Sequence, residues 1–421
     1  MTSQYVVVDT FAGAGGLAEG FFLNGFNILS HIEMNHYAAK TLQTRTLYHA
    51  LNQMGRNDIY YNYYNQKTTR EEFFEEVRSL GINDSSVLNC ELSDKNDDII
   101  IAKVSQQLAE AGRKNIDVMI GGPPCQAYSL MGRGRDPHSM VNDPRNNLYI
   151  HYLRFIREFK PEVFVFENVP GLISAKKGVI YSDFLEKIHD LGYHIRYEPC
   201  MLNAQNFGVL QNRKRIIIIG WRKENNFSDP VFETEEPLYK VWDLLSDLPE
   251  LLPGDGSDGP QKYREPYINK YLEISQIRGS NPFVRHHIAR KHNERDREIY
   301  RIAIKKWNDE KKRLRYNEVP DHLKTHKNES SFLDRFKVVD GDGVSHAVVA
   351  HLAKDGHYFI HPDSKQIRSI TVREAARIQS FPDNYLFEGS RTAQYVQIGN
   401  AVPPLMAKSI AKKIKMLLDT L

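Results

Sequence analysis

Two side chains with catalytic chemistry, Cys125 and Glu167, each follow a short apolar run in this 421-residue sequence. The run 116–120 stops at Gly-Gly-Pro-Pro directly before the cysteine, and the run 163–166 stops at the glutamate. Proline cannot continue a sheet ladder and glycine permits unusual dihedral angles, so the first run must open into a turn. The carboxyl ends of parallel strands line one crevice. We therefore expect a thiol nucleophile and a proton donor to share that crevice.

Each of these residues alone also fits a structural role. A single cysteine is commonly a small buried hydrophobe. A glutamate after a strand commonly caps a helix or carries surface charge. The position of both residues at strand ends, beside turn residues, favours an active site and leaves the structural alternatives open.

A basic turn, Gln-Asn-Arg-Lys-Arg, leads into the apolar run 216–220. Side chains alternate along a strand, so Gln211, Arg213 and Arg215 are expected to point the same way. Basic groups at the mouth of a buried strand need an anion or an acceptor as partner. A phosphate, a carboxylate or a base carbonyl would each serve.

A strand–turn–helix pattern stands at the beginning of the chain. The strand 5–8 is followed by Phe-Ala-Gly-Ala-Gly-Gly and by the helical pattern 17–25. Such glycines let the backbone approach a ligand at a helix N-terminus, although the spacing is not that of a dinucleotide fingerprint. Glu33 follows the second strand, 27–32, where an acidic side chain can hold ribose hydroxyls. The alternative is a tight turn without a ligand.

Alternating strands and helices up to residue 221 predict an α/β fold with a doubly wound, mostly parallel sheet. The insertion at about 51–115 is less regular, and its third strand is expected at 87–92. The tyrosines at positions 60, 61, 63 and 64 could stack on bases, but an inserted helical pair packed on the sheet is the favoured interpretation.

The pattern changes after residue 221, where proline, glycine, histidine and charge increase. Residues 285–315 hold 12 Lys/Arg against 5 Asp/Glu, which predicts a phosphate-facing surface, with a solvated helix as the alternative. Asp-Gly turns within 336–360 predict a β meander. A capping box at Thr371 predicts a helix, and the amphipathic pattern 405–418 predicts a last helix that packs on the first domain.

The composition limits the classes of protein. Hydrophobic residues make up 41% and charged residues 26%, which is typical of a globular protein. The net charge is +3, so a nucleic-acid partner would need a local basic patch. The three cysteines form no C-x-x-C pair, and the histidine spacing matches no metal template, so we predict no metal site. No signal peptide or membrane-spanning run is recognisable, so we expect a cytoplasmic protein without a membrane partner.

The motifs DTFAGAGG, GGPPCQAYS, FENVPG, QNRKR, TVREAARIQSFPD and QIGNAVPP, in this order, resemble those of the cytosine-C5 DNA methyltransferase family. The resemblance spans most of the chain outside 51–115 and 222–366. It implies the S-adenosylmethionine-dependent methyltransferase fold with a second, smaller target-recognition domain. The predicted domains are a catalytic and cofactor-binding domain at 1–221, the target-recognition domain at 222–367, and a C-terminal segment, 368–421, that completes the first.

The resemblance also implies residue roles. Cys125 resembles the nucleophile that adds to cytosine C6, Glu167 the residue that holds N3 and the exocyclic amine, and Arg213 and Arg215 the arginines near the catalytic centre. The positions that match S-adenosylmethionine-binding residues are Phe11, Gly13, Gly16, Glu33, Met34, Pro124, Leu148, Asn400 and Val402, with Glu91 as the best candidate for the third motif.

The activity implied is methyl transfer to C5 of a flipped-out cytosine in duplex DNA, which yields S-adenosylhomocysteine. We expect a bacterial or phage-encoded monomer, with a cognate restriction endonuclease as a candidate partner. The alternatives are a tRNA cytosine-C5 methyltransferase of the same fold, a binding module without catalysis, and an NAD-dependent dehydrogenase. The long recognition region opposes the tRNA enzyme. The intact Cys125 and Glu167 oppose the binding module, and the missing G-x-G-x-x-G opposes the dehydrogenase.

Overall fold

A mixed sheet forms the centre of the protein, for which a computed structural model describes residues 5–124, 148–196, 200–325, 327–328 and 330–421. The strand order is β3-β2-β1-β4-β5-β9-β6, with β7 also paired to β9. The strands β3, β2, β1, β4 and β5 are parallel, whereas β9 is antiparallel to β5, β6 and β7. This confirms the predicted α/β class. The strand bounds are β1 Val6–Thr10, β2 Asn27–Ile32, β3 Val87–Leu88, β4 Val118–Gly121, β5 Val163–Asn168, β6 Tyr193–Ile195, β7 Cys200–Asn203 and β9 Lys214–Arg222.

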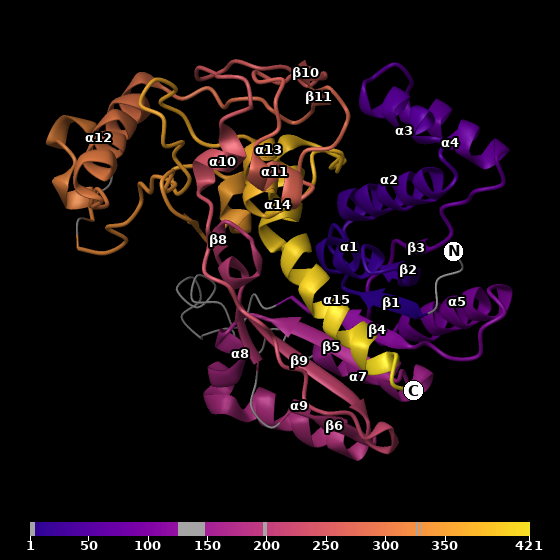
Figure 1. Ribbon diagram of the computed structural model, residues 1–421. Coiled ribbons are helices and arrows are strands. Elements are labelled where there is room, and N and C mark those ends of the chain that lie inside the picture. The colour runs from indigo at the N-terminus through magenta and orange to yellow at the C-terminus, as the bar shows by residue number, and fades with distance from the viewer. Residues whose placement is uncertain (1–4, 125–147, 197–199, 326, 329) are drawn as a thin grey trace.

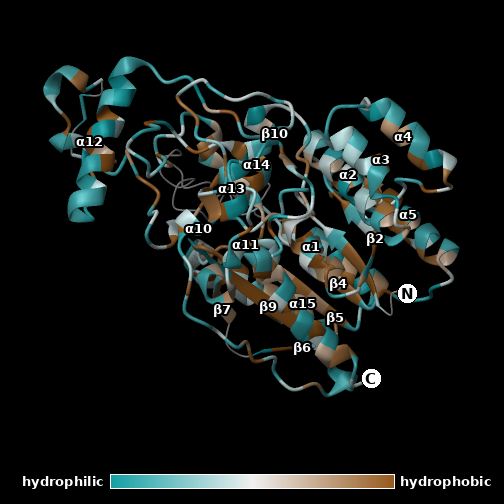
Figure 2. Ribbon diagram, turned by 45° about the horizontal axis from the view of Figure 1, so that its top comes forward, coloured by the Kyte–Doolittle hydropathy of each residue, from teal (hydrophilic) through white to brown (hydrophobic). Residues whose placement is uncertain are grey.

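The strands β1, β4 and β5 are buried along their whole length, as their β-branched and apolar runs predict for strands covered on both faces. In Figure 2 the central strands β4, β5 and β9 are brown, whereas helices at the periphery carry much teal. The third strand is shorter than predicted and ends at Leu88, so Glu91 lies beyond it.

Helices cover both faces of the sheet. One face packs on α5, α7 and α9, and the other on α1 and α15. The last helix therefore lies on the sheet beside the first, as predicted, and Figure 1 shows it crossing the sheet toward the C-terminus. The crossing is close, because a Cβ on Gly20 would lie 2.3 Å from the carbonyl carbon of Ala407. The bounds are α1 Gly16–Phe22, α5 Asp97–Glu110, α7 Leu148–Phe159, α8 Gly171–Ser174, η2 Ala175–Gly178, α9 Val179–Asp190, η3 Ala204–Phe207, η4 Lys223–Asn225 and α15 Pro404–Leu418.

The tyrosine-rich insertion forms a helical hairpin, α3 (Asn57–Tyr64) and α4 (Arg70–Ser79). It packs on α2 (His36–Gln53) rather than on the sheet, and Tyr60, Tyr64 and Phe73 are buried in an aromatic cluster between the helices. A capping box between Thr69 and Glu72 begins α4. Two of the four tyrosines are thus part of a core and unavailable for stacking on bases.

The part between residues 222 and 367 has short elements, and we call it the recognition segment after its predicted role. The predicted β meander is wrong: of the described residues in 336–360, only β12 is a strand, and it pairs with β8. Beyond β12, pairing of these described residues is limited to isolated bridges such as Val338 with Ile360. The apolar side chains divide between two cores: Phe336, Val338 and Ile360 pack with α12, whereas Val339, Val348 and Phe359 belong to a second core. The bounds are β8 Gln211–Asn212, α10 Val241–Leu245, β10 Gln261–Lys262, α11 Lys270–Ile274, β11 Phe283–Val284, α12 Glu294–Glu310, η5 Tyr316–Glu318, η6 Asp321–Leu323, β12 Ser345–His346 and η7 Ala350–Ala353.

Two further helices follow, α13 (Val372–Ile378), which begins at the predicted capping box, and α14 (Arg391–Asn400), which was not predicted. Both share one hydrophobic core with α10, α11 and β11 of the recognition segment. That core continues across residue 367, while α15 packs on the sheet. The predicted domain boundaries stay predictions.

No helix within the described residues is long and apolar enough to cross a membrane.

Candidate active site

The carboxyl ends of the parallel strands meet at one edge of the sheet. Thr10 pairs with Ile32 of β2 and with Gly121 of β4, and Gly121 pairs with Phe166 of β5. The residues that come next in each strand therefore lie along the same edge. The strand order reverses between β1 and β4, which is where ligands bind in open sheets of this kind. This edge is the candidate active site, and the predicted residues that follow directly on it are Phe11, Glu33 and Glu167.

The chain leads from β4 past Glu167 into the predicted nucleophile. A Cβ on Gly122 would lie 2.6 Å from Oε2 of Glu167, so a larger residue here would displace that carboxylate. The next turn is held from β5, because the side-chain amide of Asn168 donates to the carbonyl of Pro123 at 3.2 Å. Pro124 is the last described residue here. Cys125 and the polar segment that follows it lie outside the described residues.

Glu167 forms an ion pair with Arg215. The distance from Nε of Arg215 to Oε1 of Glu167 is 2.7 Å, and both side chains are about seven-eighths buried, with exposed fractions of 13% and 12%. The pair forms because β9 runs antiparallel to β5, so that its first residues lie beside the last residues of β5. The guanidinium holds one carboxylate oxygen in a fixed orientation at the mouth of the site.

Arg213 binds backbone carbonyls rather than a carboxylate. Its side chain is fully buried, and its Nη1 and Nη2 donate to the carbonyls of Val348 at 2.5 Å and Gly399 at 3.0 Å. Gln211 is bound nearby, donating to Oε1 of Gln379 and accepting from the amide of Val348. The expectation that the three side chains point the same way stays a prediction: Gln211 and Arg213 are buried, Lys214 between the arginines is exposed, and Arg215 reaches Glu167.

The glycine-rich turn after β1 is joined to Glu33. Oε2 of Glu33 accepts from the amide of Gly13 at 2.7 Å, and Oε1 accepts from the amide of Asn35 at 2.6 Å. Burial raises the pKa of Glu33 above its ordinary value, and the nearby charge of Asp9 acts in the same direction, against the two amide donors. The turn needs left-handed backbone at Phe11 (φ 53°) and Gly13 (φ 56°).

The C-terminal motif lies against this turn. A Cβ on Gly16 would lie 2.2 Å from the carbonyl oxygen of Val402, so the two backbones touch. Val402 is buried, whereas Asn400 is exposed at the end of α14. Residues almost 400 positions apart in sequence are thereby brought to one place, as the resemblance implied.

The other predicted cofactor residues are more dispersed. Met34 is 61% exposed and Leu148 begins α7. Glu91 is exposed, while the adjacent Leu92 is buried in the core, so its place as a cofactor residue stays a prediction.

Two groups at this edge escaped the sequence analysis. Asn89 directly follows β3 and donates to the carbonyls of Glu33 and Met34 at 2.8 and 3.1 Å, so the strand-end rule would have found it with the correct strand bounds. Beneath the edge, Nδ1 of His31 lies 3.0 Å from Oδ2 of Asp9, and both side chains are buried.

The profile of C-5 cytosine-specific DNA methylases matches residues 88–416. The chain belongs to this family. The resemblance read from the motifs is therefore confirmed, and so is the prediction of a DNA (cytosine-5-)-methyltransferase.

Relatives of this methylase align along nearly its whole length. Type II methyltransferase M.Bpa9945I of Bacillus paralicheniformis is 42% identical over 97% of this chain and 98% of its own. Type II methyltransferase M.AgeI of Thalassovita gelatinovora is 30% identical over 97% of this chain and 99% of its own. A crystal structure of a candidate DNA modification methyltransferase from an E. coli prophage covers 99% of this chain and 100% of its own, with a TM-score of 0.66 and 23% identity, which supports the fold.

Proposed function

We propose that this methylase transfers a methyl group from S-adenosylmethionine to C5 of a flipped-out cytosine in duplex DNA, through a covalent bond between Cys125 and C6. The observation that carries the proposal is the position of Glu167, fixed by Arg215 and lying against the turn that leads into Cys125.

The proposed chemistry uses a thiolate as nucleophile and a carboxylic acid as hydrogen-bond or proton donor. Cytosine C5 is a poor nucleophile. When Sγ of Cys125 bonds to C6, the ring electron pair shifts to C5, and hydrogen bonding or protonation of N3 by Glu167 stabilises the adduct. C5 then takes the methyl group, loses its proton to a base, and the thiolate leaves, which restores the ring. Arg215 is proposed to orient Glu167, and Arg213 to hold the entrance of β9 in place.

The glycine turn fits a nucleoside-type cofactor. A Cβ on Gly13 would meet no heavy atom within 4 Å, so a ligand has room to approach this backbone. Glu33 is fixed beside it by two amide donors and keeps free lone pairs for hydroxyl groups. S-adenosylmethionine, when bound, supplies an electrophilic methyl group on sulfur. We propose that Phe11, Gly13, Gly16, Glu33, Met34, Pro124, Leu148, Asn400 and Val402 bind it, that Asn89 supports Glu33 and Met34, and that no metal takes part.

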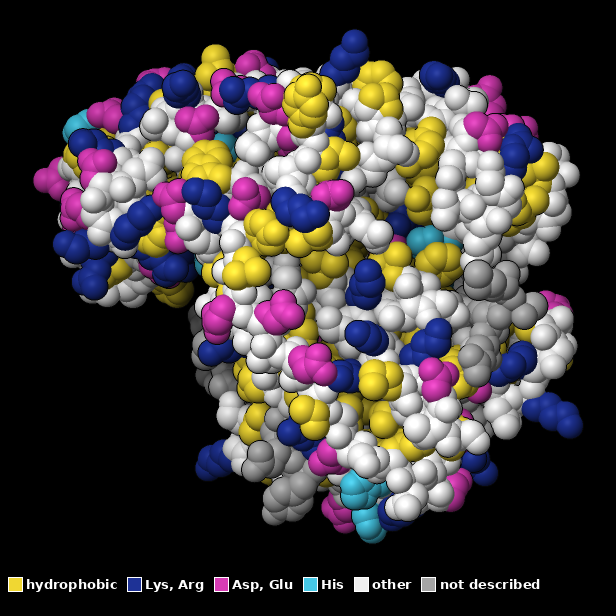
Figure 3. All heavy atoms as spheres, viewed as in Figure 1, with side chains coloured by type: hydrophobic (Ala, Val, Ile, Leu, Met, Phe, Trp, Pro, Cys, Tyr) yellow, Lys and Arg dark blue, Asp and Glu magenta, His cyan; other side chains and the backbone are white. Residues whose placement is uncertain are grey.

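Fewer cations of residues 285–315 are free to face DNA than their net charge of +7 suggests. Arg290 is buried and donates to backbone carbonyls, and along α12 Arg297, Arg301 and Lys305 pair with acids of the same helix. Lys312 also pairs with Glu310, and the exposed cations that form no ion pair within the described residues are Lys291 before the helix and Arg313 and Arg315 after it. Figure 3 shows Lys and Arg side chains gathered along the lower edge of the lobe that carries α12. We propose that this edge contacts phosphates.

The relatives named as Type II methyltransferases support a role in restriction-modification. We propose that the methylase acts as a monomer in the cytoplasm of a bacterium, or is phage-encoded, and protects a site that a cognate endonuclease cuts.

Methyl incorporation tests the proposal. Purified protein and a methyl-labelled donor are incubated with unmethylated duplex DNA and, separately, with tRNA, followed by bisulfite sequencing of both. We expect 5-methylcytosine at one short DNA sequence, and none with Cys125→Ala. Label on tRNA alone would instead support the tRNA methyltransferase alternative, and equal label with Cys125→Ala would contradict the covalent mechanism.

A further inference from the structure

The α3–α4 hairpin touches parts of the chain that are distant in sequence. Figure 1 shows it at the upper right, with β10 and β11 of the recognition segment across from it. The two are joined where Nε2 of Gln66 donates to the carbonyl of Asp258 at 3.2 Å, and where Arg285 meets Tyr64. The hairpin therefore stands between α2, on which it packs, and the recognition segment.

Tyr64 makes the most specific of these contacts. Its hydroxyl accepts from the amide of Arg285 at 3.1 Å and donates to the carbonyl of Asp383 at 2.7 Å, while its own carbonyl accepts from Nη1 of Arg285 at 2.8 Å. Both side chains are buried. Burial raises the pKa of Tyr64 to about 12, so the hydroxyl keeps its proton for Asp383. Three hydrogen bonds thus converge on one tyrosine.

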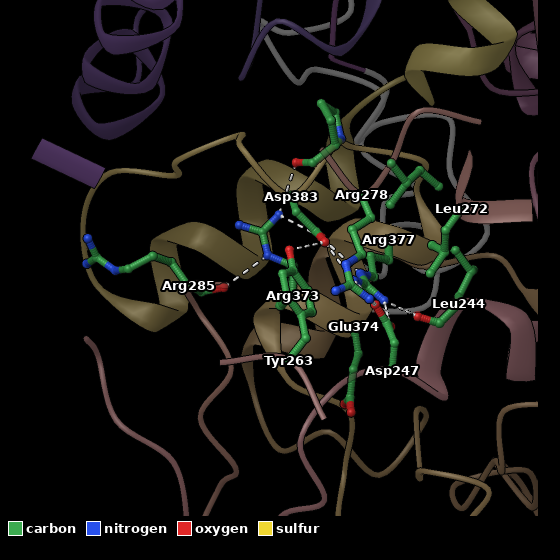
Figure 4. Close-up of polar contacts among 12 residues, drawn as sticks. Leu244, Asp247, Tyr263, Leu272, Arg278, Arg285, Arg373, Glu374, Arg377 and Asp383 are labelled. Atoms are coloured by element: carbon green, nitrogen blue, oxygen red, sulfur yellow. Dashed lines mark hydrogen bonds and ion pairs between the residues drawn. The ribbon is translucent and has the colours of Figure 1, made fainter. Parts of the chain in front are cut away.

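Asp383 connects the same point to a buried ionic network (Figure 4). Arg377 of α13 lies between Asp383 and Asp247, with contacts of 2.6 and 2.5 Å, and Tyr263 donates to Asp383 at 2.7 Å. Arg373 donates to the carbonyl of Arg285 at 3.0 Å. Asp247, Tyr263 and Arg285 belong to the recognition segment, so the network fixes that segment on α13.

The hairpin is also connected, through α2, to the candidate cofactor edge. The side chain of Asn35 caps α2, and its amide donates to Glu33. Further along, Thr44 of α2, Tyr63 of α3 and Arg70 of α4 all approach one carboxylate, Glu388, at 2.7, 2.8 and 3.7 Å. The path from Glu33 to Arg285 thus runs through packed helices and directional bonds.

We propose that the α3–α4 hairpin, through Tyr64, is a positioning element that holds the recognition segment in register with the cofactor-binding part, so that DNA bound by one meets the chemistry of the other. Segments joined through such interfaces move relative to each other by default unless the contact is extensive or directional. The expected effect on DNA binding rests on the proposed function, whereas the structural role of the hairpin does not.

The substitution Tyr64→Phe removes the hydroxyl and leaves the ring in its aromatic cluster. Tyr61→Phe is the matched control, since it is the same change in the same helix, and the tyrosine does not contact Arg285 or Asp383. With Tyr64→Phe we expect hydrogen–deuterium exchange to rise in residues 244–285 and not in α2. We also expect KM for DNA to rise about five- to tenfold, as loss of one or two hydrogen bonds allows. At saturating DNA, kcat and the Kd for S-adenosylmethionine should stay within about twofold of wild type.

The two readouts separate the two claims. Exchange is measured on the free protein, so failure of methyl transfer to any DNA would sink the proposed function and leave the exchange result standing. Unchanged exchange in 244–285, an equal rise with Tyr61→Phe, or a loss of kcat without a change in KM would each overturn the positioning role. Should Tyr64→Phe not fold, Arg285→Lys, which keeps the charge and loses the guanidinium contact with the carbonyl of Tyr64, is measured in its place with the same expectations.

Discussion

Glu33 and Glu167 are both buried carboxylates at one edge of the sheet, and their partners distinguish them. Glu33 accepts from two backbone amides, whereas Glu167 faces a guanidinium. Backbone donors fix an acceptor for neutral hydroxyl groups. In the proposed function, the charged side-chain partner instead orients Glu167 toward the base.

Replacing Glu33 by alanine should weaken cofactor binding. Loss of an acceptor for the ribose should cost about 1–3 kcal/mol. Titration calorimetry with S-adenosylmethionine measures the change, and circular dichroism checks the fold. Because the pKa of Glu33 is raised, protonation begins at a higher pH than for an exposed glutamate, so wild-type affinity should fall on acidification and the variant should lack that part of the dependence. An unchanged affinity would remove Glu33 from the cofactor site.

Substitution by lysine should affect catalysis at one arginine of the basic turn and stability at the other. Arg215→Lys should lower kcat about ten- to a hundredfold, because a lysine cannot reproduce the guanidinium geometry toward Glu167. Arg213→Lys should mainly lower the free energy of unfolding, by about 1–3 kcal/mol, because a buried carbonyl of Val348 or Gly399 loses its donor. Single-turnover kinetics and urea unfolding measure these effects, and a reversed pattern would exchange the two roles.

At this scale the sequence placed the site residues through strand ends, since apolar runs and turn residues mark where a strand stops. It could not separate Arg213 from Arg215. Their roles depend on partners elsewhere in the chain, Val348 for Arg213 and Glu167 for Arg215, which alternation along the turn does not reveal.

Elements defined by local signals agree best with the structure. The buried runs of β1, β4 and β5, the capping box of α13 and the amphipathic α15 all form within a few residues of their predicted bounds. The β meander fails because pairing among the described residues of 336–360 is limited to β12 and isolated bridges, and the apolar residues divide between two cores, a tertiary arrangement that spacing does not encode.

The crossing of α1 and α15 gives a prediction for an element pair. In Gly20→Ala the new methyl would meet the backbone of Ala407 and Lys408 at 2.3 and 2.4 Å, so the helices must separate. Overpacking of this kind should cost about 1–3 kcal/mol of the free energy of unfolding. Gly279→Ala, which meets nothing within 4 Å, is the control. Equal stability of both variants in urea unfolding would contradict the close crossing.

Over the whole molecule, histidines that are half-buried or buried link stability to pH. Burial lowers the pKa of His292 and His346 to about 4 and that of His361 to about 3. Between pH 6.5 and about 4 the unfolded chain therefore binds protons that the folded chain does not, so the free energy of unfolding falls as pH falls through this window.

From pH 7 to pH 5 we expect a loss of about 1–2 kcal/mol for each such histidine. The variant His361→Asn keeps an acceptor for the amide of Asp363 and should show a smaller loss than wild type. Urea unfolding at the two pH values measures both slopes. Identical slopes would mean that His361 is not buried in its neutral form.

At this scale the motifs predicted the likeness to a methylase, which the family profile confirms. The shared core of the recognition segment with α13 and α14 was not predictable, because it joins residues from 241 to 401 whose patterns carry no information about their partners.

The covalent bond between Cys125 and cytosine C6 is the central claim, and 5-fluorocytosine tests it most directly. Fluorine at C5 permits addition of the thiolate and methyl transfer, but it cannot leave as a cation, so the adduct should persist. A duplex with 5-fluorocytosine at the target should be methylated and stay bound to the protein through denaturing electrophoresis. The band should require S-adenosylmethionine, disappear with Cys125→Ala, and form far more slowly with Glu167→Gln. A band that persists with Cys125→Ala, or one that forms with fluorinated RNA and not with DNA, would contradict the account.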